Sequence, residues 1–164
     1  MRMLLRYSFL IALSLFMAAG CATIAQKKAP YPAPDFTVSS ITGEEYTLSQ
    51  FKGKPFVLAL GATWCPHCMH EAPIFRKVYD HYEGRVEMMG VLMKSSQKDA
   101  EEFLKKNKIN FKLALDPEGK VGKAYGVTGI PMLFFINRDG YIVDENFGGL
   151  EESDLVEKID MLLK

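Results

Sequence analysis

Two cysteines separated by two residues form the part of this sequence best suited to covalent chemistry. Cys65 and Cys68 lie in the segment Trp64-Cys65-Pro66-His67-Cys68, which follows an apolar run and opens a helical pattern. The first N–H groups of a helix are unsatisfied and carry partial positive charge, so a thiolate placed there is stabilised. One helical turn separates the two residues, so their sulfur atoms can meet. We therefore expect Cys65 to attack a disulfide bond and Cys68 to resolve the resulting mixed disulfide.

The same cysteine spacing occurs in half of a zinc site, which needs two further ligands at a suitable distance. The histidines His67, His70 and His81 all lie in one predicted helix, and the only other cysteine is Cys21. A purely structural disulfide is also disfavoured, because closing a loop of four residues contributes less than closing a longer one. We therefore expect a redox pair, with neither a metal nor another cofactor.

Two elements must hold this pair in place. Residues Pro55–Gly61 (PFVLALG) form a continuous apolar run, which is typical of a strand buried on both faces. Residues Pro66–Tyr82 have the pattern of a helix, and Pro66 suits its first position, where a missing N–H leaves no hydrogen bond unmade. The pair is therefore expected at the junction of a buried strand and a helix N-terminus.

Strands and helices alternate along the rest of the chain. Further strands are predicted over residues 36–39, 45–47, 86–92, 111–115, 132–136 and 142–147, and further helices over 99–108, 120–125 and 151–163. Such alternation indicates βαβ units and a largely parallel sheet with helices on both faces. The turn at residues 137–140 joins the last two strands as a hairpin, which adds an antiparallel strand. The predicted class is α/β, with layers in the order α/β/α.

Residues 1–20 have the layout of an export signal. Arg2 and Arg6 supply its positive start, residues 7–19 are almost continuously apolar, and Cys21 follows the small residues Ala-Ala-Gly. The apolar run is shorter than the about 18 residues that a membrane span needs. Cys21 in this setting resembles the lipobox cysteine of bacterial lipoproteins, which implies cleavage before Cys21 and a lipid on its thiol. The alternative is an ordinary export signal with an unrelated cysteine nearby.

We expect one folded domain behind a short tether. Residues 22–34 are rich in Ala, Lys and Pro, so residues 21–34 are interpreted as a lipidated cysteine with a flexible tether and residues 35–164 as the domain. Lipidation of Cys21 would leave an even pair of cysteines in a compartment where disulfides persist. The protein would then be an extracytoplasmic monomer, anchored by its N-terminal lipid to a bacterial membrane, periplasmic or on the outer face.

The charges of the chain exclude one class of partner. Twenty basic and twenty acidic residues cancel, and residues 1–20 hold two arginines and no acid, so their removal leaves a net charge of 0 − 2 = −2. A nucleic-acid partner needs a basic patch or stripe, so we expect none.

A second signal is the segment Gly129-Ile130-Pro131, where a proline enters an apolar run and must occupy the first residue of a strand or a bulge. Together with the cysteine pair, this segment resembles the thioredoxin superfamily, in particular its TlpA/ResA-like extracytoplasmic branch. The matching segments, in order over residues 34 to about 150, are Pro34–Phe36, Leu48–Pro55, Ala62–Cys65, Cys68–Pro73, Tyr125–Pro131 and Asp139–Gly140.

The resemblance implies a thioredoxin-like three-layer α/β/α sandwich with an N-terminal β-hairpin extension and a central αβ insertion. It also implies that Pro131 is cis and faces the cysteine pair, and that the backbone of Ile130 pairs with a bound substrate chain. Pro66 and His67 resemble the dipeptide of the oxidising DsbA type, while Trp64 is expected to shield the pair. These five residues are expected to border the bound substrate.

The chain departs from thioredoxins at one buried position. Thioredoxins carry an Asp six residues before the first cysteine as a proton acceptor, and here that position is Ala59. Glu71, three residues after Cys68 on the same helix face, is the candidate substitute, and TlpA/ResA-like proteins resemble this chain in having Glu there. The alternative is that Glu71 only complements the helix dipole. His67 is likewise either a cation that stabilises the Cys65 thiolate or an exposed polar residue.

The leading hypothesis is an enzyme, a thiol–disulfide oxidoreductase that reduces disulfides of exported proteins and is recharged by a membrane electron donor. In such families an apocytochrome c is one client. A disulfide donor or isomerase of DsbA-like direction is the alternative. A thiol peroxidase of peroxiredoxin type is disfavoured, because that pattern has Thr three residues before its cysteine, whereas Thr63 is two before Cys65. Copper-chaperone relatives are disfavoured because no His follows His81.

Overall fold

The computed structural model describes residues 29–82 and 84–164, so the expected signal, Cys21 and most of the tether lie outside the described residues. The strands are β1 (Tyr31–Pro32), β2 (Thr37–Ser40), β3 (Glu45–Thr47), β4 (Phe56–Gly61), β5 (Glu87–Met93), β6 (Lys112–Asp116), β7 (Met132–Ile136) and β8 (Tyr141–Phe147). The helices are α2 (Pro66–Tyr82), α3 (Gln97–Asn107), α4 (Lys120–Ala124) and α5 (Glu152–Leu163), with a 3-10 turn η2 (Leu48–Phe51). Over the described ranges, no helix is long and apolar enough to cross a membrane.

The described strands form one sheet in the order β1-β8-β7-β4-β5-β6-β2-β3. The pairs β4–β5 and β5–β6 are parallel and the remaining pairs are antiparallel. The expectation of a largely parallel sheet is therefore wrong. The connection from β6 to β7 contains only the five-residue α4, which rises about 7.5 Å and does not carry the chain back along the sheet. β7 consequently starts at the edge where β6 ends and runs antiparallel to β4.

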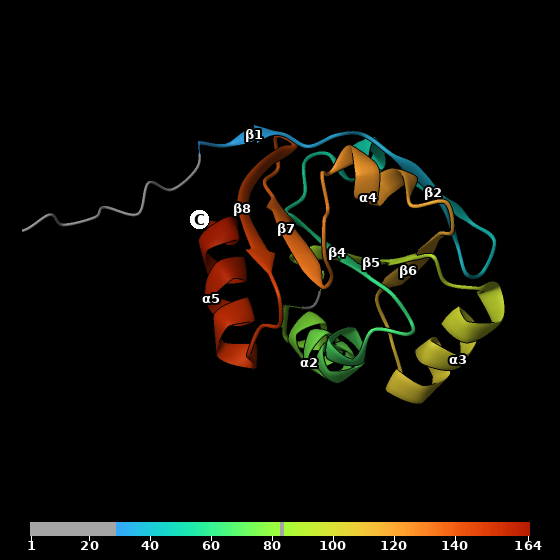
Figure 1. The fold of residues 1–164 in the computed structure, drawn as a ribbon. Helices are drawn as coiled ribbons and strands as arrows, with labels where there is room; N and C mark the ends of the chain where they lie inside the picture. Colours follow the sequence, from blue (N-terminus) through green and yellow to red (C-terminus); the bar gives the residue numbers. More distant parts are fainter. Residues whose placement is uncertain (1–28, 83) are drawn as a thin grey trace, which may run out of the picture.

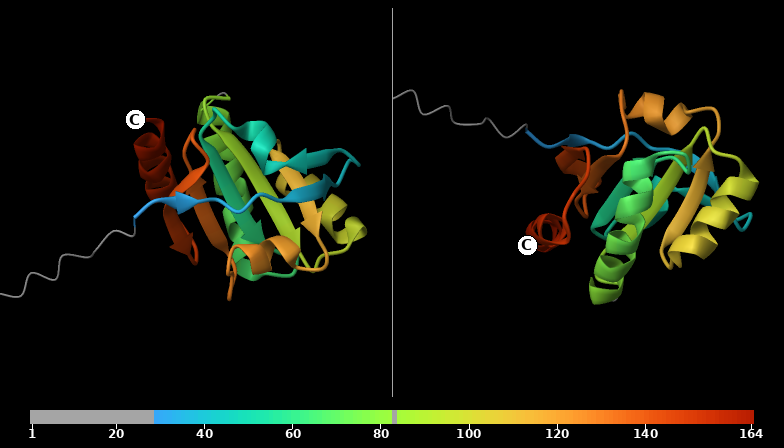
Figure 2. Two further views of the ribbon diagram at one scale, coloured as in Figure 1. Left: turned by 90° about the horizontal axis from the view of Figure 1, so that it is seen from above. Right: turned by 60° about the horizontal axis from the view of Figure 1, so that its bottom comes forward.

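Helices cover both faces of the sheet, so the predicted α/β/α sandwich is confirmed (Figures 1 and 2). On one face, α2, α3 and α5 enclose a core that includes Ala72, Phe75, Phe103, Leu155 and Ile159. On the other face, α4, η2 and the N-terminal segment enclose a second core that includes Phe36, Val38, Leu48, Leu58, Val121 and Phe134. The β2–β3 hairpin pairs with β6, and α3 with β6 forms the expected unit between β5 and α4.

The two elements around the cysteine pair form almost where the sequence predicts them. β4 is a central strand between β7 and β5, and nearly all of its residues are buried. α2 has the predicted bounds. At its end, Tyr82 is 1% exposed, and its single O–H is shared between the Val156 carbonyl at 3.1 Å and the Asp160 carboxylate at 2.8 Å. These contacts tie the end of α2 to α5.

The sheet begins before the expected domain boundary at Asp35. Tyr31 and Pro32, which the sequence places in the tether, form β1 and pair with Ile142 and Tyr141 of β8. The N–H of the next residue, Ala33, donates a hydrogen bond to the Gly140 carbonyl at 2.9 Å. A two-residue strand has no apolar period of its own, so its geometry comes from the edge of β8 and is not visible in the sequence pattern.

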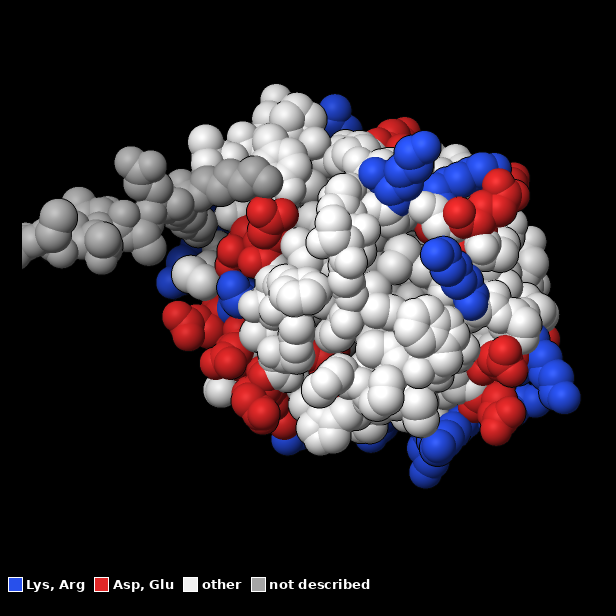
Figure 3. Space-filling model, viewed as in Figure 1, with Lys and Arg blue, Asp and Glu red and all other residues white. Residues whose placement is uncertain are grey.

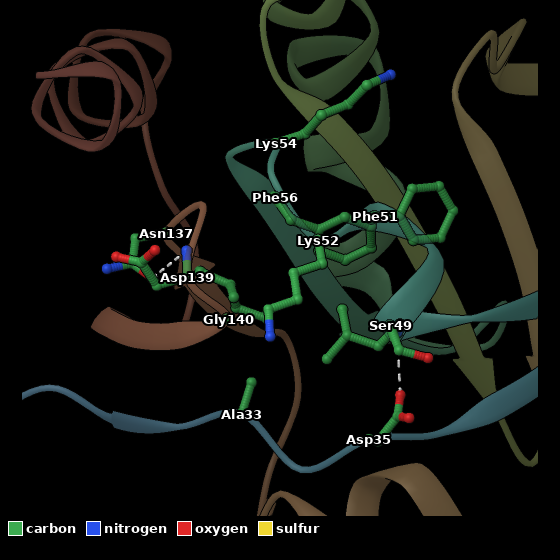
Figure 4. A pocket seen from close by; sticks show the side chains of 12 residues that line it. Ala33, Asp35, Ser49, Phe51, Lys52, Lys54, Phe56, Asn137, Asp139 and Gly140 are labelled. Carbon is green, nitrogen blue, oxygen red and sulfur yellow. Dashed lines mark hydrogen bonds between the residues drawn. The ribbon is translucent and has the colours of Figure 1, made fainter.

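The edge of the sheet opposite the cysteine pair carries a cavity of about 200 Å³ (Figure 4). Phe56 and Ile136 contribute to its apolar wall, and Lys52 is among its lining residues. Beside it, the Asp35 carboxylate accepts a hydrogen bond from the Ser49 N–H at 3.1 Å, which ties the N-terminal segment to η2. The six residues of β4 span about 20 Å, so this cavity is remote from the cysteine pair.

Candidate active site

The cysteine pair lies where the chain passes from β4 into α2. Cys65 directly precedes the helix and Cys68 lies in its first turn. Both are free thiols and are largely buried, with 4% of Cys65 and 8% of Cys68 exposed. The backbone N–H of Cys68 donates a hydrogen bond to the Sγ atom of Cys65 at 3.3 Å. The helix therefore directs an N–H group at the sulfur that the sequence predicts to be the nucleophile.

The second sulfur, that of Cys68, is enclosed by the end of β4. A Cβ atom at Gly61 would lie 3.1 Å from the Sγ atom of Cys68, so the strand can approach the thiol this closely because residue 61 is glycine. Burial raises the pKa of Cys68 to about 12, and the side chain of Cys65 adds to the rise. Cys68 therefore stays protonated near neutral pH unless a nearby group accepts its proton.

The loop before β7 closes another side of the pair. The peptide bond between Ile130 and Pro131 is cis, as the resemblance to thioredoxins implies. Ile130 is partly buried and packs against the small cluster that contains both cysteines. The carbonyl group of Pro131 accepts a hydrogen bond from the Gly148 N–H at 2.9 Å. This bond fixes the loop to the end of β8.

The residues directly around Cys65 face solvent. Pro66 and His67 are exposed. Trp64 is 62% exposed, and its Nε1–H donates a hydrogen bond to the Lys94 carbonyl at 3.2 Å. Trp64 therefore forms an exposed ridge beside the pair, held in place by the segment that follows β5.

Glu71 lies inside the fold, next to Cys68. It is 2% exposed, its Oε1 atom accepts a hydrogen bond from the Leu150 N–H at 2.6 Å, and its Oε2 atom is buried without a hydrogen-bond partner. Glu71, Cys68 and Ala59 line the same cavity of about 40 Å³. Burial raises the pKa of Glu71, while the hydrogen bond from Leu150 and two nearby histidines of α2 oppose the rise. A carboxyl group on the helix thus faces the space beside Ala59.

The histidines predicted to share one helix do so, because His67, His70 and His81 all belong to α2. In the part of the chain that the structure describes, no group of three or more His, Cys, Asp or Glu side chains could hold a metal ion.

Sequence reasoning missed two residues, one at the end of β8 and one in the segment that follows it. Leu150 supplies the N–H that holds Glu71, and Phe147 is 69% exposed beside the cis-proline loop. A Cβ atom at Gly129 would lie 2.7 Å from the ring of Phe147, so the ring covers this glycine. Gly149 was the available signal, because a Cβ atom there would lie 3.3 Å from Oε1 of Glu71. A glycine that follows a strand can mark such a close approach of the backbone.

Comparison with known proteins decides the family. The profile of the AhpC/TSA family matches residues 30–145. The chain belongs to this family. This AhpC/TSA protein is 32% identical over 126 residues to the thiol-disulfide oxidoreductase ResA of Bacillus thuringiensis subsp. konkukian (strain 97-27), over 76% of this chain and 73% of the relative. It is 31% identical over 160 residues to the sporulation thiol-disulfide oxidoreductase A of Bacillus subtilis (strain 168), over 95% of each chain.

Solved structures agree with these relatives. A thiol:disulfide interchange protein of the thioredoxin family from Chlorobium tepidum TLS matches with a TM-score of 0.75 and 25% identity, over 84% of this chain and 99% of that one. StoA from Bacillus subtilis matches with a TM-score of 0.68 and 30% identity, over 77% and 97%. A secreted disulfide oxidoreductase of Mycobacterium tuberculosis matches with a TM-score of 0.69 and 25% identity, over 77% and 96%. This AhpC/TSA protein is therefore a thiol–disulfide oxidoreductase of thioredoxin-like fold, similar to ResA.

The raised pKa of Glu71 predicts how its replacement changes stability with pH. Below the ordinary value of 4.5, the carboxyl group is protonated in the folded and the unfolded chain. As the pH rises, the unfolded chain releases this proton first, so the folded state loses stability until its own group has titrated. We expect the free energy of unfolding of Glu71→Gln to rise relative to that of the wild type between pH 4 and pH 8. Thermal unfolding of both proteins across this range measures the gain.

Glu87 is the matched control with the opposite sign. Burial acts to raise its pKa, but hydrogen bonds from Lys112 and Lys54 outweigh burial and hold the pKa below the ordinary value of 4.5. The stability that Glu87 contributes is present above this value and is lost as the pH falls through the lowered pKa. Glu87→Gln should therefore lose stability most at pH 8. The same pH dependence in both variants would contradict the raised pKa of Glu71.

Proposed function

We propose that the chain is a membrane-anchored, extracytoplasmic enzyme that reduces disulfides of exported proteins through Cys65 and Cys68. The observation that carries this proposal is the hydrogen bond from the Cys68 N–H to the Sγ atom of Cys65 at the start of α2. It directs a helix N-terminus at a thiol beside an exposed tryptophan and a cis-proline loop, which suits nucleophilic attack by that thiol.

The proposed reaction passes two electrons from the cysteine pair to a client protein. The Cys65 thiolate attacks one sulfur of the client disulfide, the S–S bond breaks, and the other client sulfur leaves as a thiolate that takes up a proton. Cys68 then loses its proton and attacks the Sγ atom of Cys65, which forms the Cys65–Cys68 disulfide and releases the second client thiol. A membrane electron donor with a reactive dithiol would return the pair to its reduced form.

Glu71 is proposed as the acceptor of the Cys68 proton. Its unpartnered Oε2 atom and Cys68 belong to one cavity of about 40 Å³. A water molecule needs about 15 Å³ of free volume, so one water can fit in this cavity and relay the proton. A pKa raised by burial brings the carboxyl group towards neutral pH, where acid–base catalysis is most effective. These observations favour proton transfer over a role limited to complementing the helix dipole.

The residues around Cys65 are proposed to contact the client chain. Trp64, Pro66 and His67 adjoin the cysteines in the chain and are exposed, Ile130 packs against the cysteine cluster, and Pro131 lines one cavity with Cys68. Figure 3 shows a broad area without charged side chains on the face seen in Figure 1, between α4 and α2, with charged residues around its margin. Such a face suits an extended polypeptide, whose backbone would pair with that of Ile130.

The location of the enzyme is proposed from its N-terminal residues. Cys21 follows Ala-Ala-Gly, and we propose that residues 1–20 are removed and that a lipid on Cys21 holds a monomer to a bacterial membrane through a tether. The similarity to a secreted disulfide oxidoreductase supports an extracytoplasmic location. An apocytochrome c, whose haem-binding cysteines must be reduced, is a client that fits this chemistry.

A disulfide donor is the second candidate function, and the dipeptide Pro66-His67 favours it because it resembles the oxidising DsbA type. The two directions differ in the redox state of the protein in cells. Rapid alkylation of thiols in living cells measures the steady-state fraction of reduced Cys65 and Cys68. A predominantly reduced pair is expected for the reductase, and a predominantly oxidised pair would replace it with the donor.

The two cysteines are expected to be non-equivalent in trapping experiments. Cys68→Ser keeps the nucleophile but loses the resolving thiol, so mixed disulfides with clients should accumulate about tenfold or more over the wild type. Cys65→Ser removes the nucleophile and should accumulate none. Non-reducing gel electrophoresis with mass spectrometry measures both variants. Equal trapping by the two variants would contradict the assignment of Cys65 as the nucleophile and Cys68 as the resolving thiol.

Glu71→Gln should slow resolution of the mixed disulfide by about 100-fold near pH 7, because the proton acceptor is lost. The wild-type rate should rise as Glu71 ionises. The deficit of the variant should shrink at alkaline pH, where hydroxide in the solvent takes the Cys68 proton in place of Glu71. Stopped-flow release of a client thiol from a preformed mixed disulfide measures this, with Glu151→Gln, an exposed acid before α5, as control. A pH–rate profile that the Glu71 substitution leaves unchanged would return Glu71 to the dipole interpretation.

Cys21→Ser should release the protein from membranes, because the lipid is attached through that thiol. Fractionation of cells into membranes and soluble material measures the release. The rate of thiol exchange by the released protein should equal that of the wild type, since Cys21 takes no part in the reaction. A variant that still pellets with membranes would mean that the apolar run of residues 7–19 is itself an uncleaved anchor.

A further inference from the structure

Trp64 separates two surface cavities beside the cysteine pair. One cavity, of about 390 Å³, lies between Trp64, α4 and the loop before β7, and its lining includes Lys94, Lys123, Thr128 and Ile130. It is called the lysine cavity here. The other cavity, of about 350 Å³, lies between Trp64 and α3. Because Ile130 packs against the cysteine cluster and also lines the lysine cavity, a client chain that reaches Cys65 past Ile130 enters this cavity.

The two cavities differ in charge. The lining of the lysine cavity contains Lys94 and Lys123 and no acidic residue. Both lysines are exposed, and within the described residues neither takes part in an ion pair. The neighbouring Lys120 is instead neutralised by Glu118 at 2.8 Å. The cavity on the α3 side is lined by two acidic residues and one lysine of that helix, so positive charge is concentrated on one side of Trp64.

Asp116 fixes the backbone of the two segments that carry these lysines. The buried carboxylate of Asp116 accepts hydrogen bonds from the N–H groups of Lys120 at 2.8 Å and Val121 at 2.9 Å, which fixes the start of α4, the helix that carries Lys123. The carbonyl of Asp116 accepts a hydrogen bond from the Lys94 N–H at 3.1 Å. Lys94 has a φ of 48°, in the left-handed region that favours glycine.

We propose that the lysine cavity binds acidic side chains of the client, so that the enzyme prefers disulfides with Asp or Glu within a few residues of the cysteine. This rests on the proposed function, because the cavity selects among clients of the Cys65–Cys68 pair. The cavity volume suits a short peptide segment. Two unpaired ammonium groups beside an otherwise uncharged face attract an acidic segment and speed its encounter with Cys65.

Three synthetic peptides test the preference. Each carries the same internal disulfide, without tryptophan, and they differ only in flanking residues that are all Glu, all Gln or all Lys. The reduced full-length protein is mixed with each peptide, and oxidation of its cysteines is followed by the fluorescence of Trp64, the one tryptophan of the chain. At low ionic strength the Glu peptide should react about tenfold faster than the Lys peptide, and the ratio should fall towards one at high ionic strength.

Three variants distinguish an effect of the lysine cavity from an effect of the net charge of the protein. Lys94→Glu/Lys123→Glu should reverse the preference. Lys52→Glu/Lys164→Glu changes the net charge equally, at the remote cavity and at the end of α5, and should leave the preference intact. Lys94→Gly relieves the left-handed backbone and should stabilise the fold while it weakens the preference for the Glu peptide. This third variant keeps the test independent of any folding defect.

Each outcome bears on one of the two proposals. Equal rates for the three peptides, or equal effects of the two double variants, would overturn the lysine cavity and leave the reductase proposal standing. A failure of the wild type to react with the Gln peptide would instead contradict the proposed function itself. A preference for the Glu peptide that weakens in Lys94→Gly and reverses in Lys94→Glu/Lys123→Glu is the expected result.

Discussion

A buried thiol that must lose its proton is the constraint around which the site is arranged. Burial raises the pKa of Cys68 to about 12, so the pair can turn over at neutral pH only when a neighbouring group takes the proton. Glu71 lies in the same cavity, with one carboxylate oxygen held by Leu150 and the other unpartnered. An unpartnered buried oxygen costs stability. The fold therefore keeps a locally unfavourable group at the place where the proposed chemistry needs it.

Three separate parts of the chain meet around the buried Cys68 thiol and Glu71. The end of β4 supplies Gly61, whose missing side chain leaves room for the Cys68 sulfur. The start of α2 supplies both thiols and Glu71. The segment after β8 supplies the Leu150 N–H, and the same segment anchors the cis-proline loop through Gly148. The cis-proline loop and the buried carboxyl group are thus held by neighbouring residues that follow one strand, which places the proposed client contact beside the proposed proton acceptor.

Elements that depend on local pattern could be predicted from the sequence, and contacts between distant segments could not. α2 and β7 have the predicted bounds, because prolines mark their beginnings and an unbroken pattern follows. β1 was missed because Tyr31 and Pro32 become a strand only against β8. The same holds for the residues of the site. A sequence motif marks the cysteines and Pro131, whereas Leu150 and Lys94 are brought to the site only by the folding of distant segments.

The central claim is that Cys65 and Cys68 form one reversible dithiol–disulfide couple. Titration of the protein in glutathione buffers of known potential, followed by the fluorescence of Trp64, measures this most directly. The account predicts a two-electron transition, with a tenfold change in the ratio of forms for about 30 mV, centred between about −270 mV for thioredoxin and about −120 mV for DsbA. The absence of a transition, or the same transition in Cys68→Ser, would contradict the account.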